Sequence, residues 1–179
     1  MPQQNNEHIW IKKALRGDQR SFKLLYDQNV EQLYRFLRQY SEDSHIVEEW
    51  VQRSFIKAYQ HLDTFKGDSR FSTWLFSIAL NEMRTDVRRK HLLVFSEQEL
   101  PEQMVESEEE RFAWHDSMKI ILQNLDEQKR SIFLLFEVEG YSHAEIAIIL
   151  HIGEGASRTL LCRAKQQLRT QWEKMEKAV

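Results

Sequence analysis

One stretch decides how this chain folds: GYSHAEIAIILHIGEGASRTLLCRAKQQLR, from Gly140 to Arg169. Ser142, followed three residues later by Glu145, forms a capping box in which hydroxyl and carboxylate satisfy backbone groups at a helix start. Gly153 and Gly155 bracket a turn, where we expect backbone freedom to be needed. The stretch therefore predicts a short helix, a glycine turn and a second helix.

The second of these helices is expected to be apolar on one side and basic on the other. The apolar positions recur at helical spacing and are Leu160, Leu161, Ala164 and Leu168; the basic ones are Arg158, Lys165 and Arg169. A short helix, a tight turn and a basic helix is the geometry that places one helix in a DNA major groove. A helical hairpin whose cations merely face solvent would show the same pattern, so the stretch alone leaves both interpretations open.

Composition favours an all-helical protein without disulfides. The 179 residues include 5 Gly and 2 Pro, and 41% are hydrophobic, which is enough for a core. The lone Cys162 suits a reducing cytoplasm. The N-terminal residues do not resemble a signal peptide, and no apolar run approaches the roughly 20 residues of a membrane span. We therefore expect a cytoplasmic protein with no membrane insertion.

The net charge of −3 is unevenly placed. Residues 93–110 hold seven carboxylates, Pro101 and no basic residue, whereas the segments on either side are mildly basic. We interpret 93–110 as an acidic flexible linker, with a solvated loop of no function as the alternative. The fold class expected is all-α: two small helical domains, residues 1–92 and 111–179, of which the second contains the helix-turn-helix.

Each domain is expected to hold four helices. In the first domain they cover residues 8–15, a segment capped by Asp18 that reaches about residue 40, a segment capped by Ser44, and residues 71–89. In the second they cover 112–122, 127–138, 144–150 and 155–173, with Asp126 as the cap of the 127–138 helix. Helical spacing assigns Tyr26, Tyr59, Trp74 and Val87, among others, to the interior.

The helix expected at 71–89 carries a second candidate nucleic-acid site. Polar and basic residues crowd its C-terminal half: Asn81, Arg84, Arg88, Arg89 and Lys90. The loop before it places Lys66 and Arg70 among aromatic residues. Cations that hold phosphates, interleaved with rings that receive bases, are typical of a groove for single-stranded nucleic acid. Cations at a helix C-terminus also stabilise the helix dipole, so a purely structural interpretation remains open.

Two stretches of the chain resemble a known protein family. VEEWVQRSFIKAYQHLDTFKGDSRFSTWLFSIALNEMRTDVRRK, residues 47–90, is similar to region two of bacterial sigma factors, and residues 125–169 are similar to their region four. The opening GDQRSFKLLYDQNVEQLYRFL fits the first helices of that family. With no large domain between the two regions, the chain resembles the extracytoplasmic-function (ECF) group. The resemblance implies a factor that binds core RNA polymerase and directs promoter recognition, melting and transcription initiation.

The resemblance also implies a role for individual residues. Core polymerase would be bound by the third helix, through Glu48, Glu49, Gln52 and Phe55. The minus-ten element would be opened and read by Lys66, Asp68, Asn81, Arg84 and Arg88. The minus-thirty-five element would be bound by Glu154, Ser157, Arg158, Thr159, Arg163 and Lys165. Arg158, near the start of its helix, is expected to read bases, while Arg163 and Lys165 hold phosphates or pack.

The chain departs from the family's pattern at four positions. Glu49 and Arg53 stand where the family often has Asp and Glu, so Arg53 reverses a charge on the expected polymerase-binding face. In GASRTLLCRA, Ser157 replaces an apolar residue and Leu160 replaces an Arg that is usual in the family.

The resemblance also implies a role for the linker and a set of partners. The acidic linker would run toward the RNA exit path and imitate nucleic acid there. The implied partners are core RNA polymerase, double- and single-stranded promoter DNA, and an anti-sigma factor.

The sequence supports two other classes of function less well. An enzyme is poorly supported, because the His residues show no metal-ligand spacing, no glycine-rich phosphate loop is present and Cys162 has no evident activating base. We therefore expect no catalytic residue, no metal and no cofactor. The stronger alternative is a stand-alone helix-turn-helix regulator whose N-terminal domain binds an effector or dimerises. That regulator would bind duplex DNA without polymerase, whereas a sigma factor needs the core enzyme.

Overall fold

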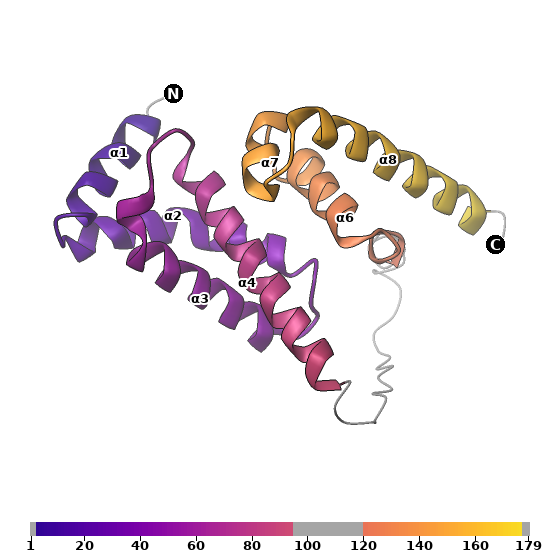
Figure 1. The fold of residues 1–179 in the computed structure, drawn as a ribbon, viewed down its shortest axis with the longest axis horizontal. Coiled ribbons are helices and arrows are strands. Elements are labelled where there is room, and N and C mark those ends of the chain that lie inside the picture. The colour runs from indigo at the N-terminus through magenta and orange to yellow at the C-terminus, as the bar shows by residue number, and fades with distance from the viewer. Residues whose placement is uncertain (1–2, 95–119, 177–179) are drawn as a thin grey trace. The chain divides into compact units, whose positions relative to one another are not determined.

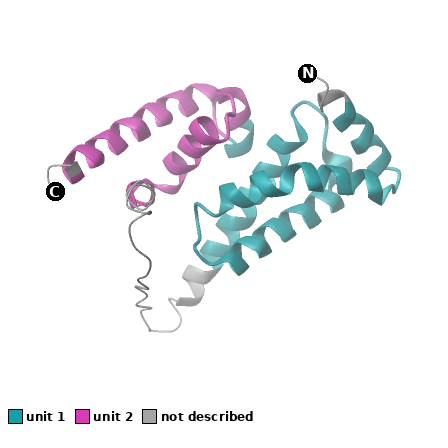
Figure 2. Ribbon diagram, turned by 180° about the vertical axis from the view of Figure 1, so that it is seen from behind, with its two compact units in different colours: residues 1–89, 147–151 teal, residues 90–146, 152–179 magenta. Residues whose placement is uncertain are grey.

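The computed structural model describes residues 3–94 and 120–176, and within them every regular element is a helix (Figure 1). The chain divides into two compact units, residues 1–89 with 147–151 and residues 90–146 with 152–179 (Figure 2). The all-α expectation is thus confirmed. Most of the acidic linker and of the helix expected at 112–122 lies outside the described residues, while residues 93 and 94 continue the preceding helix.

The first unit is built from four α-helices and one short 3₁₀ turn. They are α1 (Gln3–Ala14), α2 (Gln19–Leu37), α3 (Ser44–Gln60), η1 (Leu62–Thr64) and α4 (Phe71–Val94). Asp18 caps α2 as expected: its carboxylate accepts hydrogen bonds from the Arg20 amide at 3.1 Å and from the Ser21 hydroxyl at 2.7 Å. These bonds satisfy a backbone donor that the first helical turn leaves without an intrahelical partner.

The cap of α3 lies one residue earlier than the sequence pattern predicts. Asp43, in extended backbone, accepts hydrogen bonds from the amides of His45 at 2.9 Å and Ile46 at 3.4 Å, and Ser44 is already the first helical residue. Both residue types are good caps. The assignment of the cap to Ser44 was wrong because the choice between two adjacent caps depends on where the incoming chain turns.

The core of the first unit is aromatic and aliphatic. Its fully buried side chains include Phe36, Phe71 and Phe76, and the rings of Phe36 and Phe76 lie 5.0 Å apart. Three residues assigned to the interior are instead substantially exposed: Tyr26 (39%), Tyr59 (44%) and Val87 (51%). The apolar stripe of a helix can be wider than the area that packs against the core. Residues at the edges of the stripe can therefore be exposed.

The second unit contains α6 (Glu127–Phe133), a π-helical turn η2 (Leu134–Val138), the first half of α7 (His143–Leu150) and α8 (Glu154–Glu176), while residues 147–150 of α7 are grouped with the first unit. Asp126 caps α6 by accepting from the Lys129 amide at 2.9 Å. The capping box at α7 is present: the Ser142 amide donates to Glu145 at 2.9 Å, and the Glu145 amide donates to the Ser142 hydroxyl at 3.3 Å. Both caps agree with the sequence prediction.

The turn between α7 and α8 differs from its prediction. Neither Gly153 nor Gly155 has a positive φ, and Gly155 already lies in the first turn of α8. The left-handed residue is His151, at φ 55°. A residue with a side chain in this conformation is uncommon. The expectation that the two glycines supply the turn's freedom was therefore wrong, because the chain reverses at the end of α7.

Replacing the cap Asp18 by Ala should lower the thermal unfolding midpoint at neutral pH. The hydrogen bond from Ser21 lowers the pKa of Asp18 below its usual 3.8, so the folded chain binds this proton more weakly than the unfolded chain. The difference between Asp18→Ala and the parent should therefore be full well above pH 3.8 and disappear as the pH falls below it. Circular dichroism melts from pH 7 to pH 3 measure it.

The matched control is Asp27→Ala, on the same helix. Asp27 pairs on the surface with Lys23 at 2.5 Å and caps nothing. Its loss should change the midpoint little, because exposed ion pairs contribute about 0–1 kcal/mol. Equal effects of the two substitutions at pH 7 would show that the cap is not what stabilises α2.

Candidate functional site

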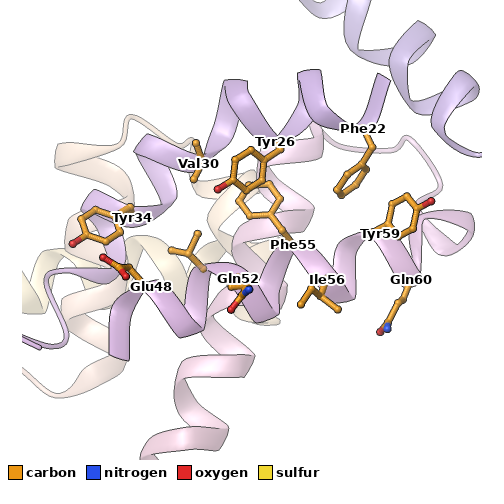
Figure 3. A pocket seen from close by; sticks show the side chains of 11 residues that line it. Phe22, Tyr26, Val30, Tyr34, Glu48, Gln52, Phe55, Ile56, Tyr59 and Gln60 are labelled. Atoms are coloured by element: carbon orange, nitrogen blue, oxygen red, sulfur yellow. The ribbon is translucent and has the colours of Figure 1, made fainter. Parts of the chain in front are cut away.

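A groove of 660 Å³ lies between α2 and α3 (Figure 3). It is lined by Phe22, Tyr26, Val30 and Tyr34 from α2 and by Glu48, Val51, Gln52, Phe55, Ile56, Tyr59 and Gln60 from α3. Ring contacts bridge the two helices, with Tyr26 and Phe55 at 4.6 Å and Phe22 and Tyr59 at 4.9 Å. Tyr26, Ile56 and Tyr59 are exposed large side chains of this groove, whereas Val51 and Phe55 at its base belong to the buried core.

The groove contains most of the residues that the sequence assigned to polymerase binding. Glu48 and Gln52 are exposed and line it, whereas Phe55 is 4% exposed and lies deeper among the aromatic rings (Figure 3). Glu49 is exposed but does not line the groove. The exposed rings of Tyr26 and Tyr59, missed as surface residues by periodicity, add to the apolar surface.

A polar seam joins α3 to α4. The indole nitrogen of Trp50 donates to the buried carboxylate of Asp86 at 3.1 Å, and Arg53 reaches the other oxygen of Asp86 at 3.4 Å. One helical turn away, Lys57 pairs with the buried Glu82. Glu82 and Asp86 were not predicted as partners of α3, although the sequence contains a signal for them: they are spaced four residues apart, as are Arg53 and Lys57 on α3.

The seam also changes how Arg53 is interpreted. Its guanidinium pairs with Glu49 on its own helix as well as with Asp86. At the expected polymerase-binding face, where Arg53 departs from the family's pattern, its positive charge is therefore paired within the chain.

The loop before α4 and the outer face of α4 carry the predicted minus-ten residues. Lys66, Asp68, Asn81 and Arg88 are exposed and Arg84 is half-buried. Asn81, Arg84 and Arg88 follow one another at spacings of three and four residues, which places them on one face of α4. The side chain of Lys90 lies outside the described residues.

An aromatic cluster anchors the loop at its two ends. Phe65 and Trp74 lie 5.3 Å apart, and Phe71 lies 6.1 Å from Phe65 and 5.8 Å from Trp74. Phe71 is fully buried, whereas Trp74 remains half-exposed. A ring that is packed on one side and open on the other can serve both as an anchor and as a stacking surface.

On α8 the predicted DNA-binding residues are mostly exposed. Arg158 pairs with Glu154 at 2.5 Å, the Thr159 hydroxyl donates to the Gly155 carbonyl at 3.0 Å, and Arg163 is exposed. Lys165 pairs with Glu137 at 2.6 Å, and its ammonium lies 5.8 Å from the ring centre of Phe136. Lys165 is therefore tied to η2 as well as being half open to solvent.

Ser157 is the exception on α8. It is fully buried, and its hydroxyl lies 2.9 Å from Nδ1 of His143, whose ring stacks on Phe136 at 4.5 Å. The packing of α7 on α8 turns this side chain away from solvent, which argues against the predicted contact of Ser157 with the minus-thirty-five element. The polar residue that replaces an apolar one in the sequence instead forms a hydrogen bond between α7 and α8.

Two further properties of the described residues bear on other functions. Among them, no group of three or more His, Cys, Asp or Glu side chains is arranged to hold a metal ion. None of their helices is both long and apolar enough to span a membrane.

Comparison with known proteins identifies two family segments. Residues 25–92 match sigma-70 region 2 and residues 120–168 match sigma-70 region 4. The ECF RNA polymerase sigma-E factor of Salmonella typhimurium is 30% identical over 188 residues, covering 94% of this chain and 95% of the relative. The RNA polymerase sigma-H factor of Pseudomonas aeruginosa is 27% identical over 183 residues, covering 92% and 93%.

Two solved structures are similar in fold. The sigma factor RpoE from Bartonella quintana, in complex with the anti-sigma factor NepR, has a TM-score of 0.74 at 23% identity and covers 85% of this chain and 96% of its own. CnrH, in complex with the cytosolic domain of CnrY, has a TM-score of 0.71 at 25% identity and covers 94% and 97%.

The α3–α4 seam predicts a specific stability effect. Trp50→Phe keeps most of the ring packing but removes the donor to the buried Asp86, and should lower the free energy of unfolding by about 1–3 kcal/mol. Urea denaturation measures it. Glu49→Gln, which touches only the exposed side of the Arg53 network, should cost less than about 1 kcal/mol. An equal or larger loss in Glu49→Gln would contradict the seam's importance.

Proposed function

Because the chain belongs to the ECF group of the sigma-70 family, whose members bind core RNA polymerase and direct transcription initiation at promoters, we propose that its two helical domains divide this work. Residues 1–92 bind core polymerase and the minus-ten element, and residues 111–179 bind the minus-thirty-five element. Residues 93–110 link them. The two family regions, matched in this order, favour this function over a stand-alone regulator.

Core polymerase binds the groove between α2 and α3, and this groove is the observation that carries the proposal. Its exposed Tyr26, Ile56 and Tyr59 provide apolar area that a partner can bury, and aromatic residues are typical centres of binding energy. Glu48 and Gln52 supply polar contacts at the same surface. The partner surface that fits is therefore apolar, with a cation opposite Glu48.

Promoter melting falls to the loop of Lys66 and Asp68 and to the outer face of α4. Asn81, Arg84 and Arg88 offer amide and guanidinium donors to the phosphates and bases of an opened strand. The half-open Trp74 provides a ring at the start of the same helix. The α3–α4 seam supports this assignment, because its contacts lie on the opposite face of α4.

The minus-thirty-five element is read by α8. Arg158 and Thr159 lie in its first turns, where base edges are reached in helix-turn-helix proteins. Arg163 and Lys165 lie further along and hold phosphates. The pairing of Arg158 with Glu154 keeps its side chain along the helix until guanine competes for the guanidinium.

The remaining assignments follow from this function. The protein acts as a transcription factor without catalytic residues, metal or cofactor, in the cytoplasm, where the polymerase works. The complexes of RpoE with NepR and of CnrH with CnrY support an anti-sigma factor as a further partner. The acidic linker follows the RNA exit path, where its carboxylates imitate nucleic acid.

Ile56→Ser tests polymerase binding. Ile56 is 48% exposed in the groove, so the substitution should fold normally and weaken core binding by roughly tenfold, the equivalent of about 1.4 kcal/mol. Ile9→Ser is the matched control, because Ile9 on α1 is also 48% exposed and lies outside the groove. Affinity of the full chain for core enzyme is measured by fluorescence anisotropy. Equal losses in both variants would remove the groove from the interface.

Arg158→Ala and Lys165→Ala test the reading of the upstream element. Arg158→Ala should cost roughly 1–3 kcal/mol against the preferred element and relax its sequence preference. Lys165→Ala should weaken binding to all sequences about equally and reduce the salt slope by roughly 1. Holoenzyme competition over a library of upstream elements, at two salt concentrations, separates them. A uniform loss with unchanged base preference in Arg158→Ala would make Arg158 a phosphate contact.

A further inference from the structure

The start of α4 is capped by a side chain from a distant part of the sequence. The carboxylate of Glu7 on α1 accepts a hydrogen bond from the Phe71 amide at 2.9 Å, 64 residues away. The first amides of a helix have no intrahelical acceptor. Arg70, the residue just before the helix, has no side-chain acceptor with which to cap it. Glu7 therefore does for α4 what Asp18 and Asp43 do for their own helices.

The same contact fixes the loop that precedes α4. Figure 1 shows α1 beside this loop, which connects η1 to α4. Gly67 is in the left-handed region at φ 79°, and Cε1 of His8 lies 3.8 Å from the position that a Cβ on Gly67 would take. Two successive residues of α1 thus meet the loop, His8 at its middle and Glu7 at its end.

Helix α1 is itself firmly placed. Ile11 and Ala14 are 5% and 6% exposed, and the turn at Gly17 leads directly into the capped start of α2. At the other end of the contact, Phe71 is fully buried in the aromatic cluster with Phe65 and Trp74. Glu7 therefore joins two fixed elements, and the exposed Lys66 and Asp68 lie in the short segment whose course that connection defines.

We propose that Glu7 is a positioning residue for promoter selectivity: by capping α4 from α1, it holds the loop of Lys66 and Asp68 in the conformation that reads the melted minus-ten strand. The inference rests on the proposed function of that loop. It adds α1, none of whose residues is assigned to nucleic-acid binding, to the elements that determine selectivity. Glu7 acts through backbone geometry and does not contact the DNA.

The test compares Glu7→Ala with Glu7→Gln in the full chain bound to core polymerase. Gln keeps an oxygen acceptor for the Phe71 amide, whereas Ala removes it. A library of minus-ten elements, scored by permanganate reactivity of melted thymines, gives the preference for each base. Glu7→Ala should reduce the discrimination at the base read by the loop by about fivefold, the usual equilibrium weight of a helix cap, and Glu7→Gln should retain most of it.

Two further measurements separate positioning from general stability. Hydrogen exchange of the segment 65–75 should accelerate in Glu7→Ala and stay near the parent rate in Glu7→Gln. Glu31→Ala, an exposed carboxylate on α2, should change neither exchange nor base preference. A loss of overall melting with an unchanged ratio between preferred and mismatched elements would indicate only a less stable fold and would overturn the proposal.

The loop's own variants distinguish this inference from the function on which it rests. If Lys66→Ala or Asp68→Ala alters the minus-ten preference but Glu7→Ala does not, the loop assignment stands and the positioning role of Glu7 is wrong. If neither loop variant alters the preference, the loop does not read the element and both proposals fall.

Discussion

The packing of α3 against α4 through buried charge is the interaction on which the first unit depends. Asp86 and Glu82 are 6% and 8% exposed, and each would be costly to bury without the partners that Trp50, Arg53 and Lys57 provide from α3. Because these hydrogen bonds and ion pairs are directional, they determine how α3 and α4 are rotated about their own axes, in addition to holding the two helices together. The rotation leaves Gln52 of α3 and Asn81 of α4 exposed.

In the second unit polar side-chain contacts also join the helices, without a buried charge. The contact of His143 with the buried Ser157 joins α7 to α8, and the pair of Glu137 with Lys165 joins η2 to α8. A hydrogen bond between buried partners is more directional than the apolar contact that Ser157 replaces. The presentation of Arg158 and Thr159 thus depends on the side-chain contact of Ser157, which directly precedes them in α8.

The sequence predicted what local physics determines. Asp18, Asp126 and the Ser142–Glu145 box were identified because a cap acts within three or four residues of itself. Helix existence and the all-α class followed from periodicity and from the scarcity of Gly and Pro. The errors at Tyr26 and Tyr59 arose at the edges of apolar stripes, where exposure depends on which neighbour the fold supplies.

Contacts between residues far apart in the sequence could not be predicted from local sequence patterns. The burial of Ser157 requires His143 to be beside it, and the cap from Glu7 to Phe71 spans 64 residues. The left-handed His151 likewise depends on how the chain leaves α7, and no glycine marks the position. Nothing in the sequence next to Ser157, Glu7 or His151 indicates these roles, which become visible only in the folded structure. The exposed positions Arg158 and Asn81 were found because a polar residue on an amphipathic helix faces outward in most folds, whereas Gln52 was implied by the family resemblance.

The division of labour between α3 and α4 can be tested by placing a photo-crosslinking amino acid at Gln52 or at Asn81 in the full chain. Holoenzyme assembled on promoter DNA would be irradiated, and the crosslinked species separated into protein and nucleic-acid adducts. The account predicts that position 52 crosslinks to core polymerase protein and position 81 to the opened promoter strand. Crosslinks from position 52 to DNA, or from position 81 to polymerase protein alone, would contradict it.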